Sequence, residues 1–210
     1  MRAVLLSLTM ALFAAAAHAG VAADHGNIVL NGRTLTTGGH DSVPVLSPDG
    51  RLVVFLRANH TPAKDCAADG SDGKPVELWR VNSDGSGVRR LLTTHGATRP
   101  ENAICDFANM QFNSIGALLY FETPAWATSG AIHVLDLATG KERLFLPGNG
   151  LQVLARCRNA RYRDDVIAAQ HRYFVFSGSY DWAFLFTPAG REVGPLGDGD
   201  YSTDLEDACG

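Results

Sequence analysis

Four glycines that interrupt apolar runs recur at nearly constant intervals along the chain. Each of them follows a small or polar residue in a turn-like context. The four are Gly32, Gly87, Gly140 and Gly190, which lie 55, 53 and 50 residues apart. Internal repetition with a period near 50 residues is typical of β-propeller blades, and it constrains the fold more than local propensity does. We therefore expect an array of β-hairpin repeats.

The stretch Val45–Phe55 shows one repeat most clearly. Its Pro-Asp-Gly turn at 48–50 is followed by the uninterrupted apolar run Leu52–Leu56, which predicts a hairpin. A run without polar alternation indicates a strand buried on both faces, as in a blade packed between two neighbours. When the turns are aligned, the corresponding inner strands are Leu118–Phe121 and Tyr173–Phe176.

The segment Leu151–Gln170 is ambiguous. It contains few residues that break helices, and its apolar spacing also fits a helix. The repeat frame favours two strands instead, at Leu151–Cys157 and Asp165–Phe176, because a helix there would remove half a blade.

The N-terminus predicts the compartment. Arg2 precedes the apolar run Val4–Ala17, and Ala17-His18-Ala19 has the small residues that a signal peptidase reads. We expect a signal peptide at 1–19 and a periplasmic protein, with secretion as the alternative; the rival interpretation of the run is a buried N-terminal helix. No other stretch is long enough to span a membrane.

Composition narrows the classes of function. The formal net charge of −4 argues against general nucleic-acid binding. The four cysteines (Cys66, Cys105, Cys157, Cys209) form no Cys-x-x-Cys pair, so structural disulfides are favoured over a zinc or redox site, with three connectivities open.

The first repeat carries a family resemblance. The residues concerned are Ser47–Arg51 with Val53–Phe55, Glu77–Asn82, Asp84–Ser86 and Arg89–Leu92. They are similar to the β-propeller repeat of TolB-like periplasmic proteins. The second repeat has lost Pro and Asp at Asn113–Gly116, and the third keeps only its outer hairpin. The resemblance implies an all-β fold, a small or incomplete β-propeller of about three to four four-stranded blades, and protein partners in the periplasm.

This frame divides the chain after the signal peptide into three parts: an N-terminal outer hairpin at 20–42 that completes or caps a blade, propeller-like repeats at 43–199, and an acidic tail at 200–210. The sequence contains three inner hairpins and four outer hairpins. The missing inner half of a fourth blade therefore comes from elsewhere in the chain and closes the ring, or the ring stays open and its exposed strand edges pair in a homodimer. In the propeller frame that the resemblance implies, Cys66 and Cys105 occupy loops of the same face. We therefore expect the bridges Cys66–Cys105 and Cys157–Cys209.

No catalytic motif is recognisable, and we predict no catalytic residue, metal site or cofactor. The candidate binding residues form a basic cluster and a group of loop residues: Arg156, Arg158, Arg161, Arg163, Trp126, His171, Tyr180 and Asp181. Arginines suit an acidic partner or an anionic polymer, although the acidic tail or water could cover them equally well. Loop aromatics suit a protein interface.

Two chemical alternatives stay open. Ser177 or Ser179 could form a hydrolytic triad with His171 and Asp181. Acidic loops could bind calcium, either at Asp65, Asp69 and Asp72 or in the tail.

The sequence thus predicts an exported, non-enzymatic binding or scaffold protein that uses a propeller loop face to hold an envelope or secreted protein. The alternatives are an exported hydrolase or lyase, and an inhibitor or immunity protein that blocks a secreted enzyme.

Overall fold

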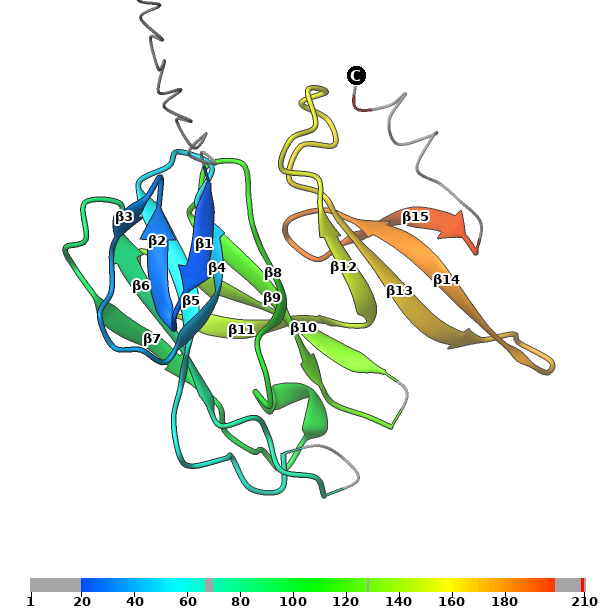
Figure 1. Cartoon of the computed structure of the whole chain (residues 1–210). Helices are drawn as coiled ribbons and strands as arrows, with labels where there is room; N and C mark the ends of the chain where they lie inside the picture. The colour runs from blue at the N-terminus through cyan, green and yellow to red at the C-terminus, as the bar shows by residue number, and fades with distance from the viewer. Residues whose placement is uncertain (1–19, 67–69, 128, 199–208, 210) are drawn as a thin grey trace, which may run out of the picture.

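The computed structural model describes residues 20–66, 70–127, 129–198 and 209, which form strands, turns and loops with very little helix (Figure 1). The predicted signal peptide and the acidic tail lie outside the described residues, apart from Cys209. Within the described ranges, no helix has the length and apolar character needed to cross a membrane.

The strands form four antiparallel sheets that follow the order of the chain. The first sheet has three strands: β1 (Val21–Asp24), β2 (Asn27–Leu30) and β3 (Arg33–Thr34). Blade 1 contains β4 (Asp41–Leu46), β5 (Leu52–Ala58), β6 (Val76–Asn82) and β7 (Arg89–Thr93). Blade 2, which follows the 3-10 turn η1 (Pro100–Asn102), contains β8 (Ala108–Phe112), β9 (Leu118–Pro124), β10 (Gly130–Asp136) and β11 (Glu142–Pro147). Blade 3 contains β12 (Asn149–Val153), β13 (Val166–Tyr173), β14 (Ser179–Phe186) and β15 (Glu192–Gly197).

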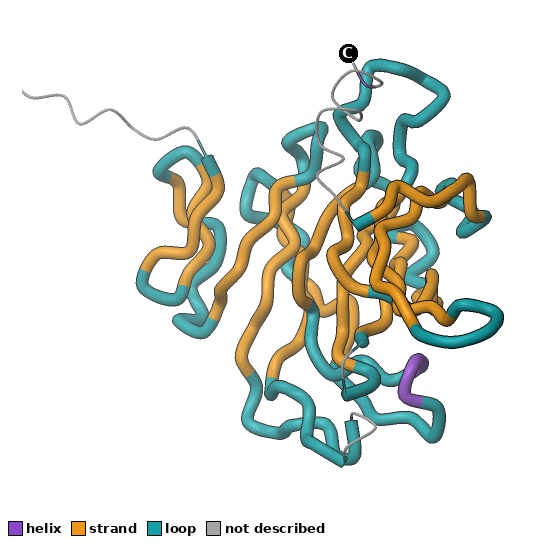
Figure 2. Tube along the Cα trace, turned by 90° about the vertical axis from the view of Figure 1, so that its right-hand side faces the viewer, coloured by secondary structure: helices purple, strands orange, loops and turns teal. Residues whose placement is uncertain are grey.

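The sheets are arranged as an open row. Figure 1 shows them following one another from the blue N-terminal sheet to the orange blade 3, and Figure 2 shows the three-stranded sheet at one end. In the described part of the chain, no strand pairing joins the first sheet to the last. The fold is therefore all-β, an incomplete β-propeller with three four-stranded blades, as the repeat spacing predicts.

The turn between the first two strands is built alike in blades 1 and 2, although its sequence differs. In blade 1 the Ser47 hydroxyl donates to Asp49 Oδ1 (2.6 Å) and accepts from the backbone N–H of Leu52 (3.0 Å). The bond from Ser47 is the main reason that the pKa of Asp49 is lowered. In blade 2 the side-chain oxygen of Asn113 plays the part of Ser47: it accepts hydrogen bonds from two backbone N–H groups of the turn, at 2.8 and 2.9 Å. Gly50 and Gly116 both have φ of +70°, a conformation that suits glycine.

Each blade buries its second strand between two neighbouring cores. On β5, Val53 and Phe55 pack toward the first sheet, whereas Val54 packs toward blade 2. On β9, Phe121 faces blade 1 and Tyr120 faces blade 3. All five side chains are fully buried, which explains why these strands lack polar alternation.

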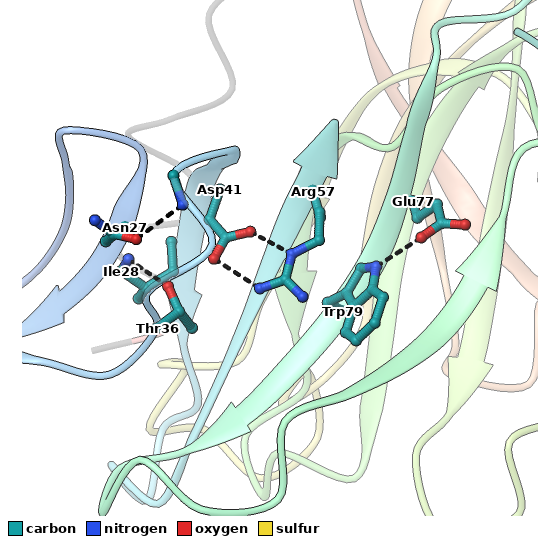
Figure 3. A network of polar contacts seen from close by, with 8 residues as sticks. Asn27, Ile28, Thr36, Asp41, Arg57, Glu77 and Trp79 are labelled. Atoms are coloured by element: carbon teal, nitrogen blue, oxygen red, sulfur yellow. Dashed lines mark hydrogen bonds and ion pairs between the residues drawn. The ribbon is translucent and has the colours of Figure 1, made fainter. Parts of the chain in front are cut away.

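The three-stranded sheet packs on blade 1 through an apolar core, and polar contacts brace residues 27–41, which lead from this sheet into β4 (Figure 3). The Thr36 hydroxyl accepts from the backbone N–H of Ile28 at 2.9 Å, and the N–H of Gly39 donates to the side chain of Asn27 at 3.0 Å. Just beyond this sheet, the buried Asp41 carboxylate pairs with Arg57 of β5. Residues 20–42 thus supply a small sheet of their own, and their role as the completion or cap of a blade stays a proposal.

Both expected disulfides are present. Cys66–Cys105 joins the β5–β6 connection to the segment that enters blade 2. Cys157–Cys209 fastens the tail to the loop before β13. Around the second bridge, Leu154 and Tyr162 of that loop cover Ile167 and Leu185, on the face of blade 3 that has no neighbouring blade. The last blade is therefore capped by its own loop and tail anchor.

One predicted inner strand is wrong. Tyr173–Phe176 is not buried: it begins at the last residue of β13 and runs into the β13–β14 turn, with Val175 and Phe176 92% and 98% exposed. The buried part of the strand is Val166–Ala168. The inner strand of the third repeat therefore lies earlier in the chain than the alignment of the turns predicted. The strand interpretation of Leu151–Gln170 is confirmed, with β12 and β13 replacing the helical alternative.

Candidate binding face

Within each blade the strands run up and down, which places several connections on the same side of the row of sheets. Because each strand reverses the direction of the one before it, the links between second and third strands leave from the same side as the links between blades. We call this side the binding face; it comprises the connections 59–75, 94–107, 125–129 and 174–178, excluding the undescribed residues 67–69 and 128.

A pocket of about 340 Å³ opens on the binding face between blades 2 and 3. Its walls come from the segment entering blade 2, the ends of β9 and β10, and the first residue of β12. The lining residues are Asp106, Ala108, Glu122, Thr123, Pro124, Trp126, Ala127, Ser129, Gly130 and Asn149.

The two carboxylates of the pocket hold its walls together. Asp106 is almost fully buried, accepts from the backbone N–H of Phe107 (2.8 Å) and pairs with Lys74 Nζ (2.5 Å). Glu122 accepts from the backbone N–H of Leu151 (2.6 Å) and from Asn109 Nδ2 (2.8 Å), and so links blade 2 to blade 3. Since both carboxylates already have donors, the walls of the pocket are held in place without a ligand.

Further bonds fix the seam between the blades. The side-chain oxygen of Asn149 accepts from the backbone N–H of Gly130 at 2.7 Å, and the N–H of Gly148 donates to the carbonyl of Gly130 at 2.9 Å. A Cβ atom on Gly130 would lie 2.9 Å from both the Asn149 side chain and the Thr123 carbonyl. Glycine is therefore required at this close approach.

Trp126 is the large aromatic side chain of this pocket. It lies in the β9–β10 connection, half-buried, and its backbone N–H donates to the Ser129 carbonyl at 2.7 Å. Sequence reasoning singled out Trp126 but missed Asp106 and Glu122. In the sequence, Asp106 is marked only by the adjacent Cys105, and Glu122 only by its position at the end of a buried apolar run.

Three other predicted residues meet on the β13–β14 hairpin. His171 and Asp181 are cross-strand partners, with His171 Nδ1 and Asp181 Oδ1 2.9 Å apart. The ring of Tyr180 contacts Phe174 and Trp182, with ring centroids 4.7 and 4.8 Å apart. This hairpin ends on the binding face, as the β9–β10 connection does.

The triad alternative lacks one contact. In the described ranges, no hydrogen bond joins His171 to Ser177 or Ser179; Ser179 pairs in the sheet with Tyr173. A serine nucleophile requires a base within hydrogen-bond reach. The arrangement therefore shows an exposed His–Asp pair without its nucleophile.

The arginine cluster lies at the other end of blade 3. Arg156, Arg158, Arg161 and Arg163 belong to the loop before β13, so the length of β13 separates them from the hairpin tip. Arg163 braces this loop by donating to the carbonyls of Cys157 (3.0 Å) and Arg158 (2.9 Å). The N–H of Arg158 donates to the Cys209 carbonyl at 3.0 Å, so the tail anchor rests on this loop. The predicted residues thus fall on two separate surfaces.

The calcium alternative finds little support in the part of the chain that the structure covers. No group of three metal-ligating side chains occurs among the described residues. Asp72 is paired with Lys64 Nζ at 2.6 Å, while Asp69 and the acidic residues of the tail beyond Asp198 lie outside the described ranges.

Comparison with known proteins gives structural likenesses only. No family model matches the chain, and no curated protein matches it. Among solved structures it is similar to a putative TolB from Agrobacterium tumefaciens (13% identity, TM-score 0.46, covering 81% of this chain and 55% of that one). It is also similar to the β-propeller domain of the Trilobed protease from Pyrococcus furiosus (12%, 0.47, 74% and 42%) and to an oligogalacturonate lyase in complex with manganese (14%, 0.48, 83% and 43%). The chain thus spans about half the length of these structures.

Proposed function

We propose that this chain is an exported, non-enzymatic binding protein of the bacterial envelope, whose binding face holds a protein partner. The observation that carries the proposal is Trp126, half-buried in the wall of a preformed pocket on that face. Tryptophans in such pockets are enriched among the residues that dominate protein–protein affinity. Export is supported by the N-terminal pattern and by two disulfides, which persist in oxidising compartments.

The size and rigidity of the pocket fit a side chain of a protein. Its volume is near the lower end of the range for small-molecule sites. Its walls are fixed by the bonds of Asp106 and Glu122 and by the adjacent Cys66–Cys105 bridge. A preformed wall reduces the entropy lost on association, so one inserted side chain contributes more to affinity.

Site-specific photo-crosslinking tests the proposal. A photoreactive residue is placed at Ala127, an exposed lining residue, in the full chain expressed in its native cell. We expect one discrete adduct, which Trp126→Ala abolishes and Ile115→Ala leaves unchanged. Ile115 is a suitable control because it is 73% exposed and lies in the β8–β9 connection, on the side of the blades opposite the binding face. The absence of an adduct, or an adduct insensitive to Trp126→Ala, would contradict the proposal.

A further inference from the structure

The β13–β14 hairpin exposes consecutive apolar side chains at its tip. Tyr173, Phe174, Val175 and Phe176 are 77%, 54%, 92% and 98% exposed. The other exposed large apolar residues in the described ranges are scattered singly, and single exposures need no explanation. Four in a row on a projecting hairpin, drawn in orange in Figure 1, mark an interaction surface.

The hairpin is held rigidly away from the body of the protein. Strand pairing continues to Tyr173 opposite Ser179, and the N–H of Phe174 donates to the Gly178 carbonyl at 3.1 Å. The ring of Phe174 rests on Tyr180, which in turn contacts Trp182 at the edge of the core. The apolar tip is therefore a defined protrusion and not a loop that has failed to pack.

Polarity is graded along the hairpin. The end carries Val175 and Phe176, and the last strand pair carries Tyr173. One pair further back, Tyr180 lies opposite Arg172, which pairs with Glu192 (2.6 Å), and behind these His171 Nδ1 lies 2.9 Å from Asp181 Oδ1. This order of apolar end, tyrosine belt and polar collar follows the polarity gradient of a bilayer interface, where tyrosine and tryptophan are enriched.

The shape of the tip fits insertion into lipid better than insertion into a groove of a partner protein. Successive residues of a strand point to opposite faces, so Tyr173 and Phe174 leave the ribbon on opposite sides. A partner surface covers one side of a ribbon, whereas lipid surrounds the tip. Strand pairing ends at Tyr173 opposite Ser179, so the apolar residues 174–176 all lie beyond the last strand pair, where lipid can surround them.

We propose that the β13–β14 hairpin inserts its tip into the interfacial layer of a lipid bilayer and holds the protein on the membrane surface without spanning it. The tip itself, residues 173–179, contains no charged side chain. Binding is therefore driven by apolar burial and depends little on anionic lipid or salt. It is independent of the pocket at Trp126.

Vesicle partitioning of the exported form, purified from cells that express the full chain, tests this inference. Phe176→Trp supplies a fluorescent reporter at a site that is 98% exposed. On addition of phosphatidylcholine vesicles we expect a blue shift, quenching by brominated acyl chains, and a partition coefficient that changes less than about threefold when one third of the lipid is phosphatidylglycerol. Val175→Ser with Phe176→Ser should lower partitioning of the chain at least tenfold, because two exposed apolar side chains are lost. Ile115→Ser is the matched control and should change nothing, and Trp126→Ala should also leave partitioning intact.

Four results would overturn the inference. The first is no partitioning at millimolar lipid, and the second is partitioning that the double serine variant leaves unchanged. The third is a dimer, seen by sedimentation velocity and lost in the double variant, in a chain that does not bind vesicles; this would assign the tip to a second copy. A protein adduct from a photoreactive residue at position 176, without vesicle binding, would assign it to a protein groove and equally overturn the proposal.

Discussion

Replacing Arg57 with methionine should destabilise the protein strongly. The Asp41 carboxylate is fully buried, and Arg57 donates to both of its oxygens at 2.6 and 2.9 Å while stacking over Trp79 at 4.3 Å. The bond to Asp41 is also the main reason that the pKa of Arg57 is raised. Without Arg57 a buried charge loses its partner, which typically costs about 3–5 kcal/mol. For a domain of this size each kcal/mol lowers Tm by roughly 2–4 °C, so we expect a fall of roughly 6–20 °C.

Circular dichroism melts and urea titrations at pH 7 measure this change. Arg90→Met is the matched control, because Arg90 is 56% exposed and its partner Glu77 keeps the Trp79 indole N–H at 2.9 Å; it should cost about 1 kcal/mol or less. Adding Asp41→Asn to Arg57→Met removes the unpaired charge and should recover part of the loss. A loss from Arg57→Met no larger than that from Arg90→Met would refute the reasoning that the buried Asp41 depends on this pairing between β4 and β5.

Three further predictions concern stability. Burial raises the pKa of Tyr120 to about 12, and among the described residues its hydroxyl has no hydrogen-bond partner. Because the fold favours the neutral phenol, stability should be complete below pH 10 and fall as the pH rises from about 10 to about 12; Tyr120→Phe should shrink that fall in pH-dependent melts, at little cost at pH 7. Cys157→Ser with Cys209→Ser opens a 52-residue separation, and the chain-entropy model predicts a loss of about 4 kcal/mol in urea unfolding. Asn113→Ala leaves two backbone N–H groups without their acceptor and should cost about 1–3 kcal/mol by the same measurement, whereas Ile115→Ala in the same turn should cost under about 0.5 kcal/mol.

The architecture could be predicted from the sequence because its signals are local and repeated. Glycine turns and unbroken apolar runs record which strands are buried on both faces, and the propeller frame then brings Cys66 near Cys105. The placement of Tyr173–Phe176 failed for a physical reason. Apolar composition does not tell which of two adjacent runs a neighbouring sheet will cover, and the shorter run Val166–Ala168 occupies the core.

The candidate site was only partly predictable. Trp126 stands out because a tryptophan in a loop lacks a packing explanation. The pocket around it depends on Asp106, Glu122 and Asn149, which come from three segments joined by bonds across blades. No local pattern encodes such a meeting. The arginine cluster shows the converse, since these residues are close in sequence and one of them, Arg163, uses its side chain to brace their own loop.

The open row has a mechanical consequence for the pocket. In a closed ring, the angle between two blades is fixed by all the others, but in the described part of this open row no strand pairing joins blade 3 back to the first sheet. Blade 3 gives the pocket one lining residue, Asn149, and the bonds that Asn149 and Leu151 make with Gly130 and Glu122 hold it against blade 2. The shape of the pocket therefore depends on these few bonds between neighbouring blades and not on closure of a ring.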